Sequence, residues 1–366
     1  MSVKIKVFTW NIGKFAEKKL NSIQTEFLKD MEPETIYVIG LQEVTNSDFD
    51  KIKTFFKIAY KDQRTVLSGE KKAGVLGLAP GDIANYGLLS IILFPLNNSP
   101  NKDSFKQQET DIKGTKGYVC VNFTFKGVNI NLVNVHLPFK DEITTQESIT
   151  TLLKKYKDDS SIIFGDFNSR SKYDDTCLNN NNVPSECLKP VIFKKNVDLN
   201  SEFKLQSALN VCADKDDTVT ECKTLREKLV KYDYIIESEI ITKSGFNELP
   251  ITFLPSYKID KETGVYSLSK DNKDGRLAGY ADRIIYNKNI EAIDYKELRE
   301  CRGNDHYPLT LTLTVKPNVG VAALINSANS IASAPLAAGG KRKKRKSRRK
   351  TNKRRTSKRT RRYKKL

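Results

Sequence analysis

The sequence has 366 residues, of which 38% are hydrophobic and 9% aromatic, a balance typical of a globular protein with an apolar core. The formal net charge is +19, from 63 Lys and Arg against 44 Asp and Glu. Residues 341–366 hold 18 of the basic side chains and no acidic one, which leaves 45 basic against 44 acidic side chains elsewhere. The charge therefore gives no reason to interpret the whole protein as nucleic-acid-binding.

The six cysteines form no CxxC pair and only two histidines are present, which argues against a zinc site. Cys177/Cys187 and Cys212/Cys222 share a ten-residue spacing that two disulfide-closed loops would explain. Free thiols are the favoured alternative, because no signal peptide opens the sequence. Polar residues interrupt the most apolar candidate span, 319–338, so we expect a soluble protein without a transmembrane segment.

Along the first half of the chain, short apolar runs typical of strands alternate with polar, helix-like patterns. We expect strands at 3–10, 35–41, 64–67, 87–94, 118–125, 128–135 and 161–164. We expect helices after the first strand to about residue 30, at 47–58 and at 145–156. Lys126-Gly127 would close a hairpin between two of the strands.

The second half of the sequence begins with a segment of different composition. Residues 171–228 contain both cysteine pairs and a run of Asn, and they are predicted to form an irregular insertion with short helices. Regular structure is expected to resume at 232–236 and 251–254, followed by a charged loop at 258–276 and strands at 282–286 and 309–315. Alternating strands and helices followed by clustered strands predict an α/β protein with mixed sheets.

The stretch SIIFGDFNSR at 161–170 is central to the functional interpretation. Its apolar run is short, β-branched and aromatic, as in a buried strand. Gly165 ends the strand and allows a close backbone approach, and Asp166 and Asn168 lie on the same side of an extended segment. Taken alone, the stretch is equally explained by an ordinary β-turn.

Polar side chains follow several of the predicted strands. The series comprises Asn11, Glu43, His136, Asp166 with Asn168, Asp282 with Arg283, and Asp305 with His306. Both histidines of the chain belong to it. Oxygen ligands without cysteine favour Mg²⁺, which takes one or two carboxylates and shares its other positions with water and substrate phosphate. The sequence therefore predicts a Mg²⁺ site at the strand ends.

The ordered series WN…LQE…VHL…GDFN…DRI…NDH, over residues 5–315, resembles the endonuclease/exonuclease/phosphatase superfamily. This resemblance implies an α/β, four-layered α/β/β/α sandwich with two mixed β-sheets (DNase I-like) that acts on phosphoesters with Mg²⁺. The later motifs resemble those of the inositol polyphosphate 5-phosphatases. They are FLPSYK at 253–258, RLAGYADRI at 276–284, KGTKG at 113–117, and KYD at 231–233 in the place of the family's F-D-Q.

The chain departs from the 5-phosphatase motifs at several positions. Ala278, Tyr280 and Ala281 stand where the family has Pro, Trp and Cys, although Tyr280 keeps an aromatic plane. Asp274 stands in place of a family lysine, which Lys273 or Lys270 would have to replace. The 171–228 insertion has no evident counterpart.

The resemblance also implies roles for the metal site and the substrate pocket. Glu43 would ligate Mg²⁺, with Asn11 and Asp305 close to the metal or the phosphate. Asn11 capping a turn is the structural alternative. The expected substrate-binding side chains are Lys116, Tyr257, Lys258, Lys273 and Arg276. A solvated charged loop is the alternative for these cations.

Five residues would carry the catalysis that the resemblance implies. Asp166 would activate water as general base, and Asn168 would position that water. Asp282 would hydrogen-bond His306 and favour the imidazolium that stabilises the phosphoryl oxygens, and His136 would hold a phosphate oxygen from the other side. The alternative for Asp282 is a plain ion pair with its neighbouring arginine.

The domain prediction has three parts. We expect a catalytic domain at 1–316, a linker at 317–340 and a disordered polybasic tail at 341–366, because like charges repel and do not fold. An anionic membrane, nucleic acid or a nuclear import receptor would each bind such a tail. We expect a monomer in the cytoplasm, with membrane-surface association or nuclear entry through the tail.

The favoured function is a Mg²⁺-dependent inositol polyphosphate or phosphoinositide 5-phosphatase. The first alternative is a Mg²⁺-dependent nuclease of the same superfamily that acts on DNA or RNA and is anchored by the tail. The second is a non-enzymatic binding protein in which the tail is the function. The intact series of polar residues argues against the second alternative.

Overall fold

The computed structural model describes residues 2–13, 17–72, 86–113, 116–138, 142–169, 209–213, 220–231, 233–266 and 278–317. All of them belong to one compact unit, Met1–Val319. The predicted basic tail, 341–366, and most of the predicted linker lie outside the described residues. The linker and tail boundaries therefore stay predictions.

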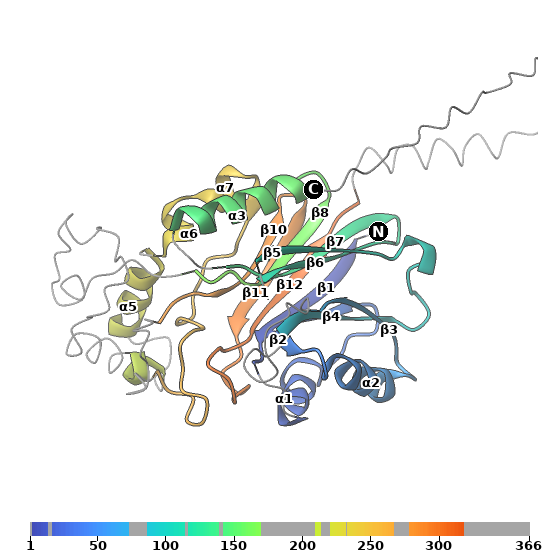
Figure 1. Cartoon of the computed structure of the whole chain (residues 1–366), viewed down its shortest axis with the longest axis horizontal. Helices are drawn as coiled ribbons and strands as arrows, with labels where there is room; N and C mark the ends of the chain where they lie inside the picture. The colour runs from blue at the N-terminus through green and yellow to red at the C-terminus, as the bar shows by residue number, and fades with distance from the viewer. Residues whose placement is uncertain are drawn as a thin grey trace, which may run out of the picture. The chain divides into compact units, whose positions relative to one another are not determined.

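The first sheet contains both ends of the compact unit. Its six strands follow the order β11-β12-β1-β2-β4-β3, and only the β1–β2 pair is parallel. The strands are β1 Val3–Asn11, β2 Ile36–Thr45, β3 Arg64–Lys71, β4 Tyr86–Pro95, β11 Ile290–Glu297 and β12 Leu309–Val315. Strand β1 therefore lies in the interior of the sheet (Figure 1).

The second sheet is built around the stretch singled out in the sequence. Its order is β5-β6-β7-β8-β10-β9, and only β7 and β8 are parallel. The strands are β5 Lys106–Lys113, β6 Lys116–Phe125, β7 Val128–His136, β8 Ser160–Asp166, β9 Phe246–Asn247 and β10 Asp282–Asn287. Strand β8, with the predicted base at its end, is interior.

Helices cover the outer face of each sheet. The helix α1 (Glu17–Ser22), its π-helical continuation η1 (Ile23–Phe27) and α2 (Phe49–Tyr60) pack on the first sheet. The helices α3 (Glu142–Tyr156), α6 (Tyr234–Glu237) and α7 (Ile240–Lys243) pack on the second. A third apolar cluster joins the inner faces of the two sheets. The predicted four-layered sandwich is confirmed (Figure 1).

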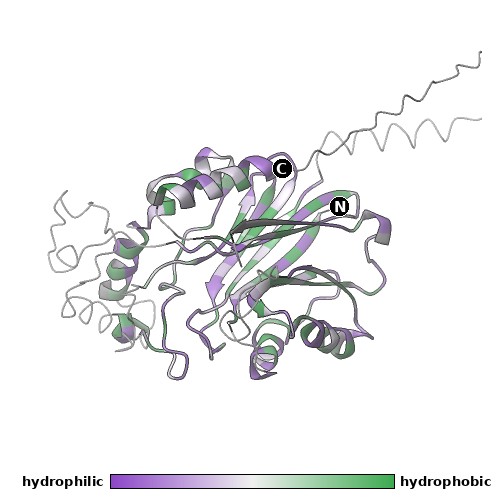
Figure 2. Cartoon of the chain, in the orientation of Figure 1, coloured by the Kyte–Doolittle hydropathy of each residue, from purple (hydrophilic) through white to green (hydrophobic). Residues whose placement is uncertain are grey.

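The residue pattern of β1 explains this burial on both faces. Side chains alternate between the faces of a strand. Val3, Ile5 and Val7 accordingly point into the core between the sheets, whereas Phe8 and Trp10 pack beneath the helices. The covering helices combine hydrophobic and hydrophilic residues (Figure 2), as expected for helices with one buried side.

Of two predictions about the second half, the one at 251–254 needs correction, and the regular structure expected at 232–236 is confirmed. The regular segment predicted at 251–254 contains neither helix nor strand, because its apolar side chains enter the core without its backbone joining a sheet. The segment predicted at 232–236 contains the start of the short helix α6, which Asp233 caps by accepting from the Ile235 and Ile236 amides.

The cysteine interpretation was wrong for one pair. Cys212 and Cys222 form a disulfide, because the helical residues 209–213 and α5 (Thr220–Lys231) bring their Cα atoms to 5.3 Å. Cys177 and Cys187 lie outside the described residues. In the part of the chain that the structure describes, no helix combines the length and the apolar composition needed to cross a bilayer.

Candidate active site

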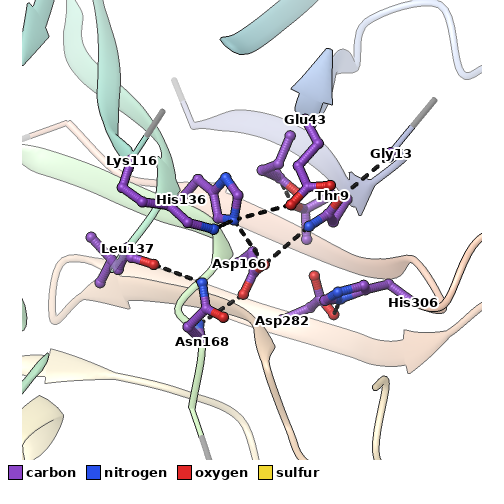
Figure 3. A network of polar contacts seen from close by, with 12 residues as sticks. Thr9, Gly13, Glu43, Lys116, His136, Leu137, Asp166, Asn168, Asp282 and His306 are labelled. Atoms are coloured by element: carbon purple, nitrogen blue, oxygen red, sulfur yellow. Dashed lines mark hydrogen bonds and ion pairs between the residues drawn. The ribbon is translucent and has the colours of Figure 1, made fainter. Parts of the chain in front are cut away.

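The polar residues that follow the strands meet between the two sheets (Figure 3). The first sheet contributes Asn11 at the end of β1, Glu43 on β2 and His306 shortly before β12. The second contributes His136 at the end of β7, Asp166 at the end of β8 and Asp282 at the start of β10. The strand register places His136 and Asp282 on either side of Asp166.

Asn11 and Asp166 connect the two sheets. The Asn11 Nδ2 donates to Asp166 Oδ2 at 3.1 Å, and both side chains are buried. The Asn11 Oδ1 also accepts from the backbone N–H of Gly13 at 3.2 Å. The turn-capping alternative is therefore correct but incomplete, since the same side chain also holds the carboxylate.

Asp166 is held as an ionised carboxylate. The Asn168 N–H donates to its Oδ1 at 2.7 Å, and His136 Nε2 lies 3.2 Å from its Oδ2. Burial would raise the pKa of Asp166, but the hydrogen bond with His136 and the charges of His306 and Lys116 hold it well below its usual range. Asp166 is therefore in the ionised form at neutral pH, the form that is able to accept a proton.

The segment after β8 is held by local contacts and by a close backbone approach. Asn168 has a φ of 51°, and its Nδ2 donates to the Leu137 carbonyl at 2.6 Å. At Gly165 a Cβ would lie 2.1 Å from the carbonyl oxygen of Val135, which confirms the predicted close approach. Residues 167–169 form no β-turn, so the β-turn alternative for this stretch is not supported.

His136 lies between an acidic and a basic side chain. Its Nε2 is 3.7 Å from Glu43 Oε1, contacts the Lys116 ammonium, and lies close to Asp166. Burial and the charge of Lys116 lower the pKa of His136, so the ring is neutral at neutral pH. A neutral Nε2 accepts from Lys116 or donates to Asp166, but it cannot do both.

His306 and Asp282 form the second buried pair. Their Nδ1 and Oδ2 atoms are 2.8 Å apart, and Ser256 Oγ donates to the same Oδ2 at 2.8 Å. Burial alone would lower the pKa of His306, but the Asp282 charge raises it to about 9. The ring is thus an imidazolium at neutral pH. Arg283 pairs with Asp233 and Glu248 instead, so the ion-pair alternative for Asp282 was wrong.

Comparison with known proteins places the chain in a family. The model of endonuclease/exonuclease/phosphatase family 2 matches residues 8–312. The chain belongs to this family. The wider superfamily comprises phosphoesterases that generally depend on a divalent metal, commonly Mg²⁺.

Solved structures show the same fold at low identity. A nitrophorin of Cimex, solved as a ferrous NO complex, has a TM-score of 0.57 at 16% identity and covers 86% of this chain and 99% of its own. The inositol polyphosphate 5-phosphatase domain of SPsynaptojanin, solved with inositol (1,4)-bisphosphate and a calcium ion, has a TM-score of 0.53 at 18% identity. That match covers 91% of this chain and 92% of the other. These likenesses show the fold alone, so function has to be argued from the site.

The donor set of this endonuclease/exonuclease/phosphatase family member fits a hard divalent cation. Glu43 and Asp166 each place a carboxylate oxygen within 3.7 Å of His136 Nε2, and Glu43 is about one-third exposed, at 32%. Among the described residues, no three His, Cys, Asp or Glu side chains converge into a closed cage. Mg²⁺ needs only one or two carboxylates when water and substrate phosphate complete its shell.

The remaining predicted site residues of this family member are Asp305 and the substrate-binding candidates of the second half. The ring centre of Tyr257 lies 4.6 Å from that of His306, with the two ring planes tilted by 42°, and Lys258 follows it, half-buried. Asp305 Oδ1 lies 3.9 Å from Lys261 Nζ, at a partly exposed position. Lys273 and Arg276 lie outside the described residues.

Two residues that contact the site residues were not predicted from the sequence. Ser256 belongs to the FLPSYK motif, and its neighbours were chosen for their charge and ring, but the Ser256 hydroxyl is what contacts Asp282. Asn304 directly precedes the Asp305-His306 pair, and its Nδ2 donates to the carbonyl of Asn11. Ser256 directly precedes Tyr257-Lys258, and Asn304 directly precedes Asp305-His306. This proximity to predicted residues could have identified both.

Proposed function

We propose that this chain is a Mg²⁺-dependent phosphomonoesterase that removes the 5-phosphate from inositol polyphosphates or phosphoinositides. The supporting observation is the packing of the two 5-phosphatase-like segments on the His306–Asp282 pair. Tyr257 forms β-bridges with Gly279, in the RLAGYADRI segment, and with His306. The segments that carry the resemblance therefore also build the site.

The chemistry assigned to the side chains follows from their charge states. Asp166, ionised and buried, takes the proton of a water held by Asn168, as the water oxygen bonds to phosphorus and the ester P–O bond breaks. The leaving oxygen takes up a proton from solvent. The His306 imidazolium and the Lys116 ammonium neutralise charge on the phosphoryl oxygens, and His136 donates to one of them.

The metal belongs to the same proposal. Glu43 would hold Mg²⁺, with Asn11 and Asp305 close to it, and the bound ion supplies charge neutralisation at the phosphoryl group. Recognition of the other ring phosphates needs cations around a polar pocket. Lys116 and Lys258 are the described candidates, and Lys273 and Arg276 stay predictions.

The polybasic tail is assigned to an anionic membrane surface in this proposal. Its 18 Lys and Arg would each contribute about 1 kcal/mol when close to anionic lipid. Such binding would concentrate a cytoplasmic, monomeric enzyme on phosphoinositides. Nucleic-acid binding and nuclear entry are the competing roles of the tail.

The test is phosphate release from a substrate panel. Inositol 1,4,5-trisphosphate, the 4,5-bisphosphate lipid in vesicles, and single-stranded and abasic DNA are each incubated with Mg²⁺ or with EDTA. His306→Ala serves as the blank. Mg²⁺-dependent release from the inositol substrates alone is the expected result, and a preference for vesicles would support the membrane role of the tail.

The alternatives give different results in the same panel. DNA cleavage that Asp166→Asn abolishes, without inositol phosphate hydrolysis, would overturn the proposal in favour of a nuclease. Silence on every phosphoester, by a folded protein, would favour the non-enzymatic role.

A further inference from the structure

The turn that follows β1 carries Asn11 into the site, and three contacts hold its backbone. The Asn11 carbonyl accepts from Asn304 Nδ2, and the Ile12 carbonyl accepts from the Lys19 ammonium. The Ile12 N–H donates to the Gln42 carbonyl at 3.0 Å. Together these contacts fix the Asn11–Ile12 peptide plane and the Ile12–Gly13 plane that follows it.

Lys19 is an unusual residue for this task. Its side chain is 4% exposed, although lysine is rarely buried unless paired, and its ammonium lies 5.9 Å from the centre of the Trp10 ring. Burial lowers its pKa to about 8, so it is mainly cationic at neutral pH. Asp305 and Glu43 act on it electrostatically, which places the charge near the site.

Asn304 joins the same turn to the His306 segment. Its side chain is 2% exposed, and its Oδ1 lies 2.8 Å from where a Cβ on Gly13 would stand. Gly13 itself has a φ of +53°, which favours glycine. Two residues after Asn304, the His306 carbonyl accepts from Trp10 Nε1 at 2.8 Å. The histidine segment is thus bonded to the turn through Asn304 and to the end of β1 through Trp10.

We propose that Lys19 and Asn304 are positioning residues that hold the turn from Asn11 to Gly13, so that the Asn11 amide reaches Asp166. Neither residue touches Asp166 in the described contacts, so both act through Asn11. The kinetic test of this inference rests on the proposed phosphatase function, and the structural test does not.

The kinetic test is a set of double-mutant cycles. Lys19→Met and Asn304→Ala are each made in the wild-type chain and in Asn11→Ala, and kcat and KM are measured with inositol 1,4,5-trisphosphate. A misplacement of about 1 Å costs roughly 10²-fold. We expect each variant to lower kcat about 10- to 100-fold with KM changed less than about 2-fold.

The outcome in the second background decides the inference. In Asn11→Ala, each further change should lower kcat less than about 2-fold, because the residue that it positions is already gone. Equal losses in both backgrounds, or wild-type kcat in both single variants, would overturn the inference. Lys18→Met is the matched control, because Lys18 is the exposed neighbour on the same helix, and its kcat should be unchanged.

The structural test measures hydrogen–deuterium exchange of peptides that contain residues 10–13, with no substrate present. Lys19→Met and Asn304→Ala should each speed exchange of the turn about 10-fold, while Lys18→Met leaves it unchanged. Unchanged exchange in both variants would overturn the inference. A wild-type chain that is inert on inositol phosphates but shows this exchange pattern would refute the proposed function and support the positioning role.

Discussion

The Nδ1 atom of His306, which precedes β12 of the first sheet, lies 2.8 Å from Oδ2 of Asp282, which opens β10 of the second sheet. Both side chains are buried, and a third group, the Ser256 hydroxyl, fixes the carboxylate. The carboxylate stabilises the charged ring in a place where burial alone would discharge it. The charge state of the pair is therefore open to a direct test.

We predict that kcat falls as pH rises through about 9. The pKa of His306 is raised above the ordinary 6.5, so the imidazolium is present below that range and is lost above it. Asp282→Asn removes the stabilising charge and should move this limb of the pH–rate profile down to about 6.5 or below. An unmoved alkaline limb in Asp282→Asn would show that another group controls it.

Asp166→Asn should lower kcat about 10²- to 10³-fold and leave KM nearly unchanged. The amide keeps an oxygen for the Asn168 N–H but cannot accept the proton of water. Steady-state kinetics and the thermal midpoint of the variant measure the two effects separately. A variant that is folded and retains more than a tenth of kcat would rule out Asp166 as the base.

Glu43→Gln should raise the Mg²⁺ concentration for half-maximal activity roughly tenfold or more, because it removes one full charge from the metal site. Excess Mg²⁺ should restore part of the activity, and EDTA should abolish it. Glu34→Gln is the control, since Glu34 is exposed and pairs with Lys126. Equal Mg²⁺ requirements in the two variants would contradict the assignment of Glu43.

Arg283→Met should lower the free energy of unfolding by about 3–5 kcal/mol, because it leaves two buried carboxylates without their cation. Arg283 is 0% exposed and bonds Asp233 and Glu248. Urea unfolding measures the loss, which should be smaller at pH 5 than at pH 8, since burial raises the pKa of Glu248 and its protonation removes one of the buried charges.

Lys296→Met gives the matched comparison for this ion pair. Lys296 forms an exposed pair with Asp294, 3.3 Å away, and its loss should change the unfolding free energy by less than about 1 kcal/mol. Similar losses of unfolding free energy in the two variants would mean that burial is not the reason for the large contribution of the Arg283 pairs.

The interior strands were predictable from the sequence, and several edge strands were not. Strands β4 and β8 are apolar runs because layers cover both of their faces. The sequence analysis did not predict β5, β9 and β11, and each of these is an edge strand of its sheet. The sequence of β5 is largely polar, charged residues interrupt the apolar residues of β11, and β9 has only two residues, so none offers an apolar run.

The site was predictable where its residues follow strands, and less so where they act through the backbone. The sequence placed Asp166 and His306 next to recognisable motifs, and the fold brings their segments together. The contact of Lys19 with a carbonyl has no such signal, because Lys18 and Lys19 look alike in the sequence. Their difference arises only when α1 packs against the first sheet.

The central contacts of the site share one property. Asn11 with Asp166 and Glu43 with His136 each join one sheet to the other, and His306, just before β12 of the first sheet, contacts Asp282 of the second. Enzyme activity should therefore depend on how closely the two sheets pack against each other. A measurement of secondary-structure content does not detect this packing. A compact state with loosened side chains would keep its strands and lose the site. In a urea titration, activity should thus disappear before the far-ultraviolet dichroism does.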